Sequence, residues 1–128
     1  MVQLDRICQT TSWGTPNSST KVYYENGTIN WLKSGEVSQG LIYSAEQKIT
    51  ELGLKNSSAK IFPVDTVLVT MYGATAGQVG LLKIESATNQ AICGILPSDR
   101  IIPKFLFYLL KGKKDYLITL STGGAQPN

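Results

Sequence analysis

The sequence contains no histidine, the side chain that most often serves as a general base or metal ligand near neutral pH. Catalytic arrangements of the Ser-His-Asp or Cys-His kind are therefore excluded within these 128 residues. Cysteine is scarce as well. Cys8 and Cys93 lie far apart and form no Cys-x-x-Cys motif, so we expect two reduced, buried thiols.

Long apolar runs and a strong net charge are also missing. No stretch approaches the roughly 20 apolar residues of a membrane span. The first ten residues carry Asp5 and Arg6 and lack an apolar signal core, so we expect a cytoplasmic protein. The net charge of +3 is too small for a protein that coats DNA by charge alone. It fits an ordinary solvated surface and, equally, a protein that touches phosphates but takes its specificity from other contacts.

The pattern of apolar, glycine and proline residues predicts a single α+β domain over residues 1–128. We expect a mixed, twisted β-sheet flanked by a few helices. Runs rich in β-branched and apolar residues predict strands at 22–24, 29–32, 66–72, 78–84 and 90–96.

Helices are predicted at 44–52, 103–111 and 113–120. The first would begin at a capping box formed by Ser44 and Gln47. The second would carry Pro103 in its first turn and a cap at Ser98 or Asp99. Its apolar face would consist of Phe105, Leu106, Leu109 and Leu110.

A glycine-rich segment separates two of the predicted strands, with Gly73, Gly77 and Gly80. It does not match Gly-x-Gly-x-x-Gly and no Lys-Ser/Thr pair follows, so it gives little support to nucleotide binding. A wide hairpin that needs glycine for positive φ explains it. Such a hairpin also lets the backbone approach DNA closely. Tyr72, Thr75 and Gln78 would then offer side chains to phosphates or base edges.

Residues 13–36 interleave aromatic, basic and amide side chains on predicted loops, which suits groove and phosphate contact. The alternative is a polar loop region anchored by core tryptophans, and we expect Trp31 in the core. The adjacent amides Asn89 and Gln90 match the groups that read adenine edges, but a structural pair that ties loops together is favoured. A basic cluster is expected to be a solvated helix face: Lys104, Lys111, Lys113 and Lys114.

The acidic residues are scattered and make no recognisable catalytic pair or metal motif. We therefore expect no catalysis by this chain alone, no cofactor and no metal. Two further classes stay open. A protein- or glycan-binding module would use exposed aromatics such as Trp13, Tyr23 and Tyr24, and a small enzyme using Cys8 or Cys93 would need a base that the chain lacks.

Five segments carry a family resemblance by their order and separation: 27–36, 53–60, 70–80, 87–92 and 121–128. Each segment alone is weak, but five in the right order are fairly specific. Together they resemble the target recognition domain of a type I restriction-modification specificity subunit, with the fold of a DNA methylase specificity domain.

The resemblance implies that this domain reads one half of a split, asymmetric site in double-stranded DNA. Methyltransferase (modification) subunits would bind S-adenosylmethionine and methylate adenine, and a restriction and translocase subunit would cut DNA. Relative to that family, the conserved spacer helix and the second recognition domain are missing from residues 1–128.

On this interpretation we expect the DNA contacts to come from loop residues. The candidate DNA-binding residues are Thr15, Asn17, Lys21, Tyr23, Tyr24, Asn30, Lys33, Ser34, Lys60, Tyr72, Thr75 and Gln78. One small domain with few base contacts should bind weakly alone, at micromolar scale or poorer, and should lose affinity steeply with added salt.

Overall fold

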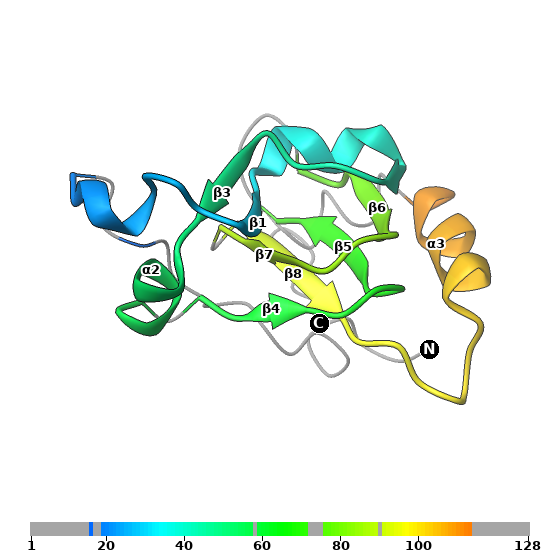
Figure 1. Cartoon of the computed structure of the whole chain (residues 1–128). Helices are drawn as coiled ribbons and strands as arrows, with labels where there is room; N and C mark the ends of the chain where they lie inside the picture. Colours follow the sequence, from blue (N-terminus) through cyan, green and yellow to red (C-terminus); the bar gives the residue numbers. More distant parts are fainter. Residues whose placement is uncertain (1–15, 17–18, 58, 72–75, 90, 114–128) are drawn as a thin grey trace, which may run out of the picture.

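The computed structural model describes residues 16, 19–57, 59–71, 76–89 and 91–113. Within them the chain forms two four-stranded sheets and four short helices (Figure 1). The elements are η1 Lys21–Tyr23, β1 Ile29–Leu32, η2 Ser34–Gln39, β2 Leu41–Ile42, β3 Gln47–Ile49, α2 Glu51–Lys55, β4 Ile61–Phe62, β5 Val67–Thr70, β6 Val79–Leu82, β7 Ser86–Thr88, β8 Ile92–Ile95 and α3 Pro103–Lys111.

The first sheet has the order β3-β1-β7-β4. β1 runs antiparallel to β3 and parallel to β7, while β4 runs antiparallel to β7. Trp31 of β1 is only 6% exposed and packs with Ile49 and Ala87. The prediction that Trp31 belongs to the core is therefore confirmed.

The second sheet has the order β2-β6-β5-β8. β5 pairs antiparallel with β6 and β8, and β2 pairs parallel with β6. Every residue of β5, β6 and β8 is buried, which explains why these strands are nearly continuous apolar runs in the sequence. The α+β class with mixed strand pairing is confirmed, although the strands divide into two sheets.

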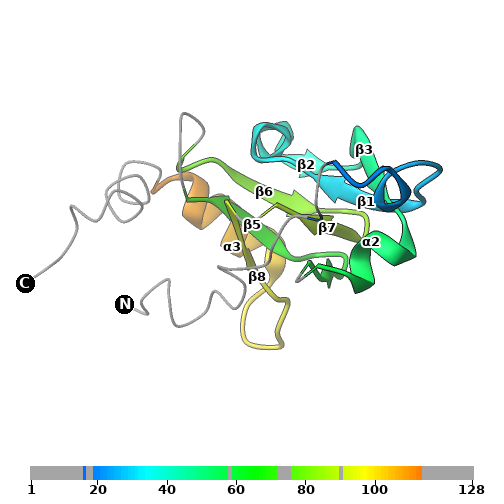
Figure 2. The same cartoon turned by 90° about the vertical axis from the view of Figure 1, so that its left-hand side faces the viewer.

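Helix α3 covers the second sheet on one side, and η1 and α2 lie together at the far end of the first sheet (Figure 2). The predicted bounds of α3 are confirmed, and Pro103 lies in its first turn. The helix begins after Ile102, which makes no side-chain cap, so the predicted cap at Ser98 or Asp99 is wrong.

The core-facing side of α3 differs from the prediction. Leu106 and Phe107 are buried, and Leu110 packs against the same apolar cluster. Phe105 and Leu109, which we expected to face the core, are exposed. The apolar residues of α3 therefore occupy both its inner and its outer face.

The helix predicted at 44–52 is wrong. Its middle part is β3, in which Gln47 pairs with Trp31, and the helix α2 begins only at Glu51. A capping box at Ser44 and Gln47 is excluded because Gln47 is already in extended backbone. Thr50 is the N-cap instead, and its Oγ1 accepts a hydrogen bond from Gly53 N at 3.0 Å.

Two further predictions are wrong and a third lies almost entirely outside the described residues. The prediction of a strand at 22–24 is wrong, because Lys21–Tyr23 forms a 3₁₀ turn. Cys93 is buried as expected, but it is disulfide-bonded, so the expectation of a reduced thiol there is wrong. The helix at 113–120 lies outside the described residues apart from Lys113. No helix in the described part of the chain has the length and apolar character to cross a membrane.

Candidate nucleic-acid interface

The connection between β7 and β8 joins the two sheets, and the Asn89 side chain in it bonds to the segment after β1. Its Nδ2 donates a hydrogen bond to Ser34 Oγ at 3.3 Å, and its Oδ1 accepts one from Ala91 N at 3.0 Å. The carbonyl of Ala91 accepts Met71 N at 2.9 Å. We call these four residues the Asn89 junction. Their bonds agree with the structural role favoured for Asn89; Gln90 lies outside the described residues.

Three predicted DNA-contacting residues lie at the Asn89 junction or next to it: Ser34, which belongs to the junction, and Lys33 and Lys60. Lys33 and Ser34 directly follow β1, which runs parallel to β7 and ends beside Thr88. Lys60 immediately precedes β4, which runs antiparallel to β7 and begins at that same end. Lys33 and Lys60 are exposed and Ser34 is half-buried. The register of the first sheet thus gathers these residues from distant parts of the chain.

Gln78 is connected to this region through the backbone of the second sheet. Its backbone N–H donates to Thr70 Oγ1 at 3.0 Å, and its carbonyl accepts Thr70 N–H at 3.0 Å. These bonds close the base of the glycine-rich connection between β5 and β6. Because Met71 is bonded to Ala91, the base of this connection is tied to the Asn89 junction.

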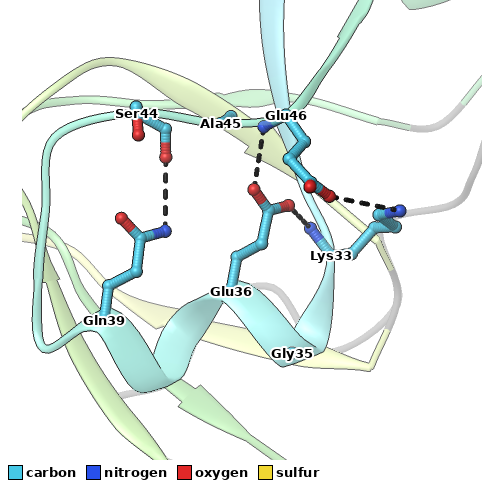
Figure 3. A pocket seen from close by; sticks show the side chains of 7 residues that line it. All are labelled: Lys33, Gly35, Glu36, Gln39, Ser44, Ala45 and Glu46. Carbon is cyan, nitrogen blue, oxygen red and sulfur yellow. Dashed lines mark hydrogen bonds and ion pairs between the residues drawn. The ribbon is translucent and has the colours of Figure 1, made fainter.

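A hollow of about 720 Å³ opens next to Lys33 (Figure 3). Helix η2 forms one wall, and the segment 44–46 crosses above it. The lining residues are Lys33, Gly35, Glu36, Gln39, Ser44, Ala45 and Glu46. Sequence reasoning singled out only Lys33 as a DNA contact here. Gln39 belongs to no sequence motif, and Ser44 was interpreted only as a helix cap.

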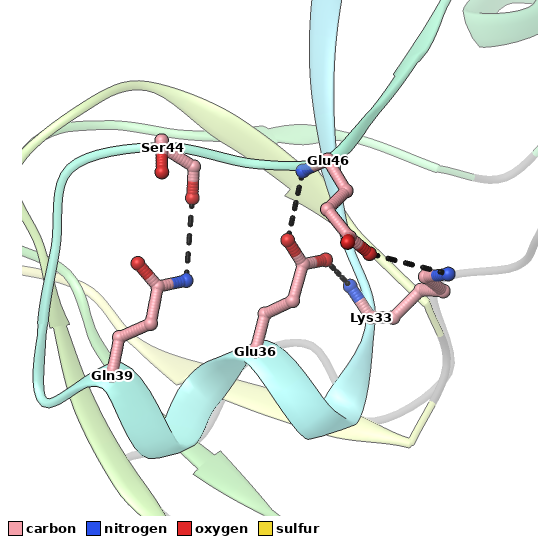
Figure 4. A network of polar contacts seen from close by, with 5 residues as sticks. All are labelled: Lys33, Glu36, Gln39, Ser44 and Glu46. Carbon is pink, nitrogen blue, oxygen red and sulfur yellow. Dashed lines mark hydrogen bonds and ion pairs between the residues drawn. The ribbon is translucent and has the colours of Figure 1, made fainter.

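Glu36 fixes the shape of this hollow (Figure 4). Its two carboxylate oxygens accept hydrogen bonds from Lys33 N at 2.9 Å and from Glu46 N at 2.8 Å. Both oxygens therefore anchor backbone. Lys33 Nζ lies 3.9 Å from Glu46 Oε1, and both side chains are well exposed. Such an exposed ion pair contributes little to stability. The Lys33 ammonium can therefore leave Glu46 and bind a phosphate at a small cost in free energy.

Lys21, Tyr23 and Tyr24 lie at the other end of β1, away from the Asn89 junction. Lys21 makes an exposed ion pair with Glu25 at 3.6 Å. The Tyr24 ring meets Trp31 edge-on, and its hydroxyl donates to the Pro16 carbonyl. Burial raises the pKa of Tyr24 above its ordinary value. These contacts favour a packing role for Tyr24.

Asn30 uses its amide within the first sheet. Its Nδ2 donates to the Glu85 carbonyl at 3.0 Å, and its Oδ1 accepts Lys48 Nζ at 2.9 Å. Asn30 therefore bridges β1, β3 and the residue before β7. The sequence did not indicate that Lys48 bonds to Asn30, because Lys48 was expected on a helix.

Four candidate residues, Thr15, Asn17, Tyr72 and Thr75, lie outside the described part of the chain, as does Trp13. Among the described residues, no group of three or more Cys, Asp or Glu side chains is placed to hold a metal ion. Apart from Asn30 in the middle of β1, the described candidates thus form two groups, one around the Asn89 junction and one at η1.

The profile of the family described as type I restriction modification DNA specificity domain matches residues 1–128. The chain belongs to this family. It is 34% identical over 118 residues to the MjaIX type I specificity subunit of Methanocaldococcus jannaschii, covering 88% of this chain and 27% of that protein. It is 30% identical over 113 residues to the HindI type I specificity subunit of Haemophilus influenzae, covering 86% and 24%. The resemblance read from the sequence is confirmed.

The fold is similar to the crystal structure of the HsdS subunit from Thermoanaerobacter tengcongensis, with a TM-score of 0.66. That likeness covers 92% of this chain and 28% of the other at 17% identity, so it bears on the fold. The chain spans about a quarter of the length of these relatives.

Proposed function

We propose that residues 1–128 form one target recognition domain, which reads one half of a bipartite duplex DNA site within a type I specificity subunit. The observation that carries the proposal is the match to the type I DNA specificity family along the whole sequence. The Asn89 junction supports it, because buried strands and side-chain bonds there hold several polar loop residues in a fixed relation.

In this proposal the loops around the Asn89 junction face the DNA. Lys33 and Lys60 hold phosphates, and Ser34 adds a hydroxyl contact. Gln78, with Tyr72 and Thr75 on the same connection, reaches base edges. Each good bidentate contact to a base contributes about 1–3 kcal/mol of discrimination. Asn89 itself fixes the loops and reads no base.

A second contact area is proposed at the η1 end, from Lys21 and Tyr23. Thr15, Asn17, Tyr24 and Asn30 stay predictions of DNA contact. The bonds made by Tyr24 and Asn30 favour a supporting role for those two.

We further propose that the chemistry resides in partner subunits, in the cytoplasm. Methyltransferase subunits would modify adenine, and a restriction and translocase subunit would join through them. The chain would be non-catalytic, which is consistent with the lack of histidine throughout its sequence.

Salt-dependent binding of a labelled DNA duplex, followed by fluorescence anisotropy, tests the placement of the phosphate contacts. Lys33→Ala and Lys60→Ala should each weaken binding to all sequences alike. Each should also lower the slope of log affinity against log salt by about 0.9, the value for one phosphate contact.

Lys104→Ala provides the matched control, since Lys104 is an exposed lysine in the first turn of α3, outside both proposed contact areas. It should leave the slope unchanged. If neither Lys33→Ala nor Lys60→Ala changes the slope, or if wild-type affinity is indifferent to salt, the proposed interface is wrong.

A further inference from the structure

The outer face of α3 is apolar although its side chains are exposed. Four large apolar side chains are exposed on and just before this helix: Ile102 (72%), Phe105 (59%), Tyr108 (56%) and Leu109 (43%). The inner face is apolar too, with Leu106 and Phe107 buried against β5 and β6. A helix at the protein surface normally exposes a polar face to solvent, and a helix that is apolar on all sides is normally buried.

These exposed residues form one continuous surface. At 3.6 residues per turn, Ile102, Phe105 and Leu109 follow one line along the helix, and Tyr108 lies beside Phe105. Figure 1 shows α3 (orange) at the edge of the molecule, against the sheet that contains β6. A cavity of about 270 Å³ continues the surface past the start of α3, between Ile102 and the exposed ring of Tyr43. We call this surface the α3 face.

Positive charge borders the α3 face. Residues 96–113 contain four basic residues and one acidic residue, so this segment carries a net charge of +3, equal to that of the entire chain. Lys104 and Lys111 are two helical turns apart and therefore lie on the same side of the apolar line. Lys111 Nζ lies 5.4 Å from the centre of the Phe107 ring, and both lysines are exposed.

We propose that the α3 face docks an amphipathic helix of a partner protein, with apolar residues at spacings of three and four and an acidic row along one edge. The apolar centre of the face would be buried and the acidic row would meet Lys104 and Lys111. Duplex DNA fits this surface poorly, because large apolar side chains at its centre have no counterpart on phosphates. The proposal extends the suggested assembly with protein subunits and does not depend on DNA recognition.

A designed peptide probe tests the docking directly. The peptide is an amphipathic helix of about 18 residues, with leucines on one face and glutamates along one edge. A matched peptide carries lysines in place of the glutamates. Anisotropy of the labelled peptides should show binding of the acidic peptide to the full chain, weakened by salt, and much poorer binding of the basic one.

Two variants of the outer face should lose this binding while keeping the fold. Phe105→Gln and Leu109→Gln should each lower the affinity for the acidic peptide about tenfold, as expected for a central apolar contact. Leu52→Gln is the matched control, because Leu52 is an equally exposed leucine on α2, and it should leave binding unchanged. Lys104→Glu should lower the affinity for the acidic peptide and raise the affinity for the basic one.

Other outcomes would overturn the proposal. Failure of the acidic peptide to bind, or equal binding of both peptides, would contradict the stated partner chemistry. Self-association of the chain that Phe105→Gln abolishes in sedimentation would assign the face to a second copy. Loss of duplex DNA binding in Phe105→Gln would place the face in the DNA interface instead. Conversely, peptide binding by a chain that binds no DNA would leave this inference standing and remove the proposed function.

Discussion

At the residue scale, Gly94 determines how closely the two sheets approach. A Cβ at this position would lie 2.3 Å from Cε1 and 2.4 Å from Cζ of Phe62. Phe62 belongs to β4 of the first sheet, is fully buried, and packs within the cluster that contains Leu32 and Leu68. The ring therefore has little room to withdraw, and the glycine is required by packing against a neighbouring sheet.

We expect Gly94→Ala to lower the free energy of unfolding by about 1–3 kcal/mol, the usual effect of overpacking a core. Urea unfolding followed by tryptophan fluorescence measures this change. Gly35→Ala is the control, since no heavy atom lies within 4 Å of the added Cβ there, and its effect should stay within about 0.5 kcal/mol. Equal stability of Gly94→Ala and the parent chain would contradict the close packing of the sheets.

At the scale of elements, Thr50 holds α2 against η1. Its Oγ1 accepts a hydrogen bond from Gly53 N at 3.0 Å and donates one to the Val22 carbonyl at 2.7 Å. Thr50→Ala should therefore destabilise the fold by about 1–2 kcal/mol in urea unfolding. Thr50→Ser keeps the hydroxyl and should retain most of the stability. If serine and alanine are equally destabilising, the hydroxyl does not contribute as described.

The elements that sequence predicted well are those whose signals are local. Strand β5 is a run of β-branched and apolar residues, and α3 has proline in its first turn. The region 44–52 failed because a local helix signal competes with a distant partner: Lys48 pairs with Asn30 across β1 and β3. Strands β2 and β4 have two residues each, too few to show any period.

The same limit applies to the candidate site. The sequence offered polar loops, but the bond between Ser34 and Asn89 joins residues 55 positions apart and only the sheet register brings them together. Likewise, the sequence could not reveal that α3 turns Phe105 outward. Its apolar residues are spread around the helix, and only packing against β5 and β6 selects the inner side.

At the scale of the whole molecule, the excess positive charge lies in a different segment from the proposed DNA interface. The net charge of +3 resides in residues 96–113, and basic and acidic residues balance over the remaining chain. Around the Asn89 junction, Lys33 stands near Glu36 and Glu46, which offset its charge. Affinity for DNA would therefore come from a few placed contacts, with little help from a general positive field.

Selection from random duplex DNA at low salt, using this chain alone, tests the central claim most directly. A domain that reads half of a bipartite site should enrich one short, asymmetric motif of a few base pairs, and added salt should weaken its binding steeply. Salt-sensitive binding without any enriched motif, or no binding even at low salt, would contradict the claim that this domain reads DNA sequence.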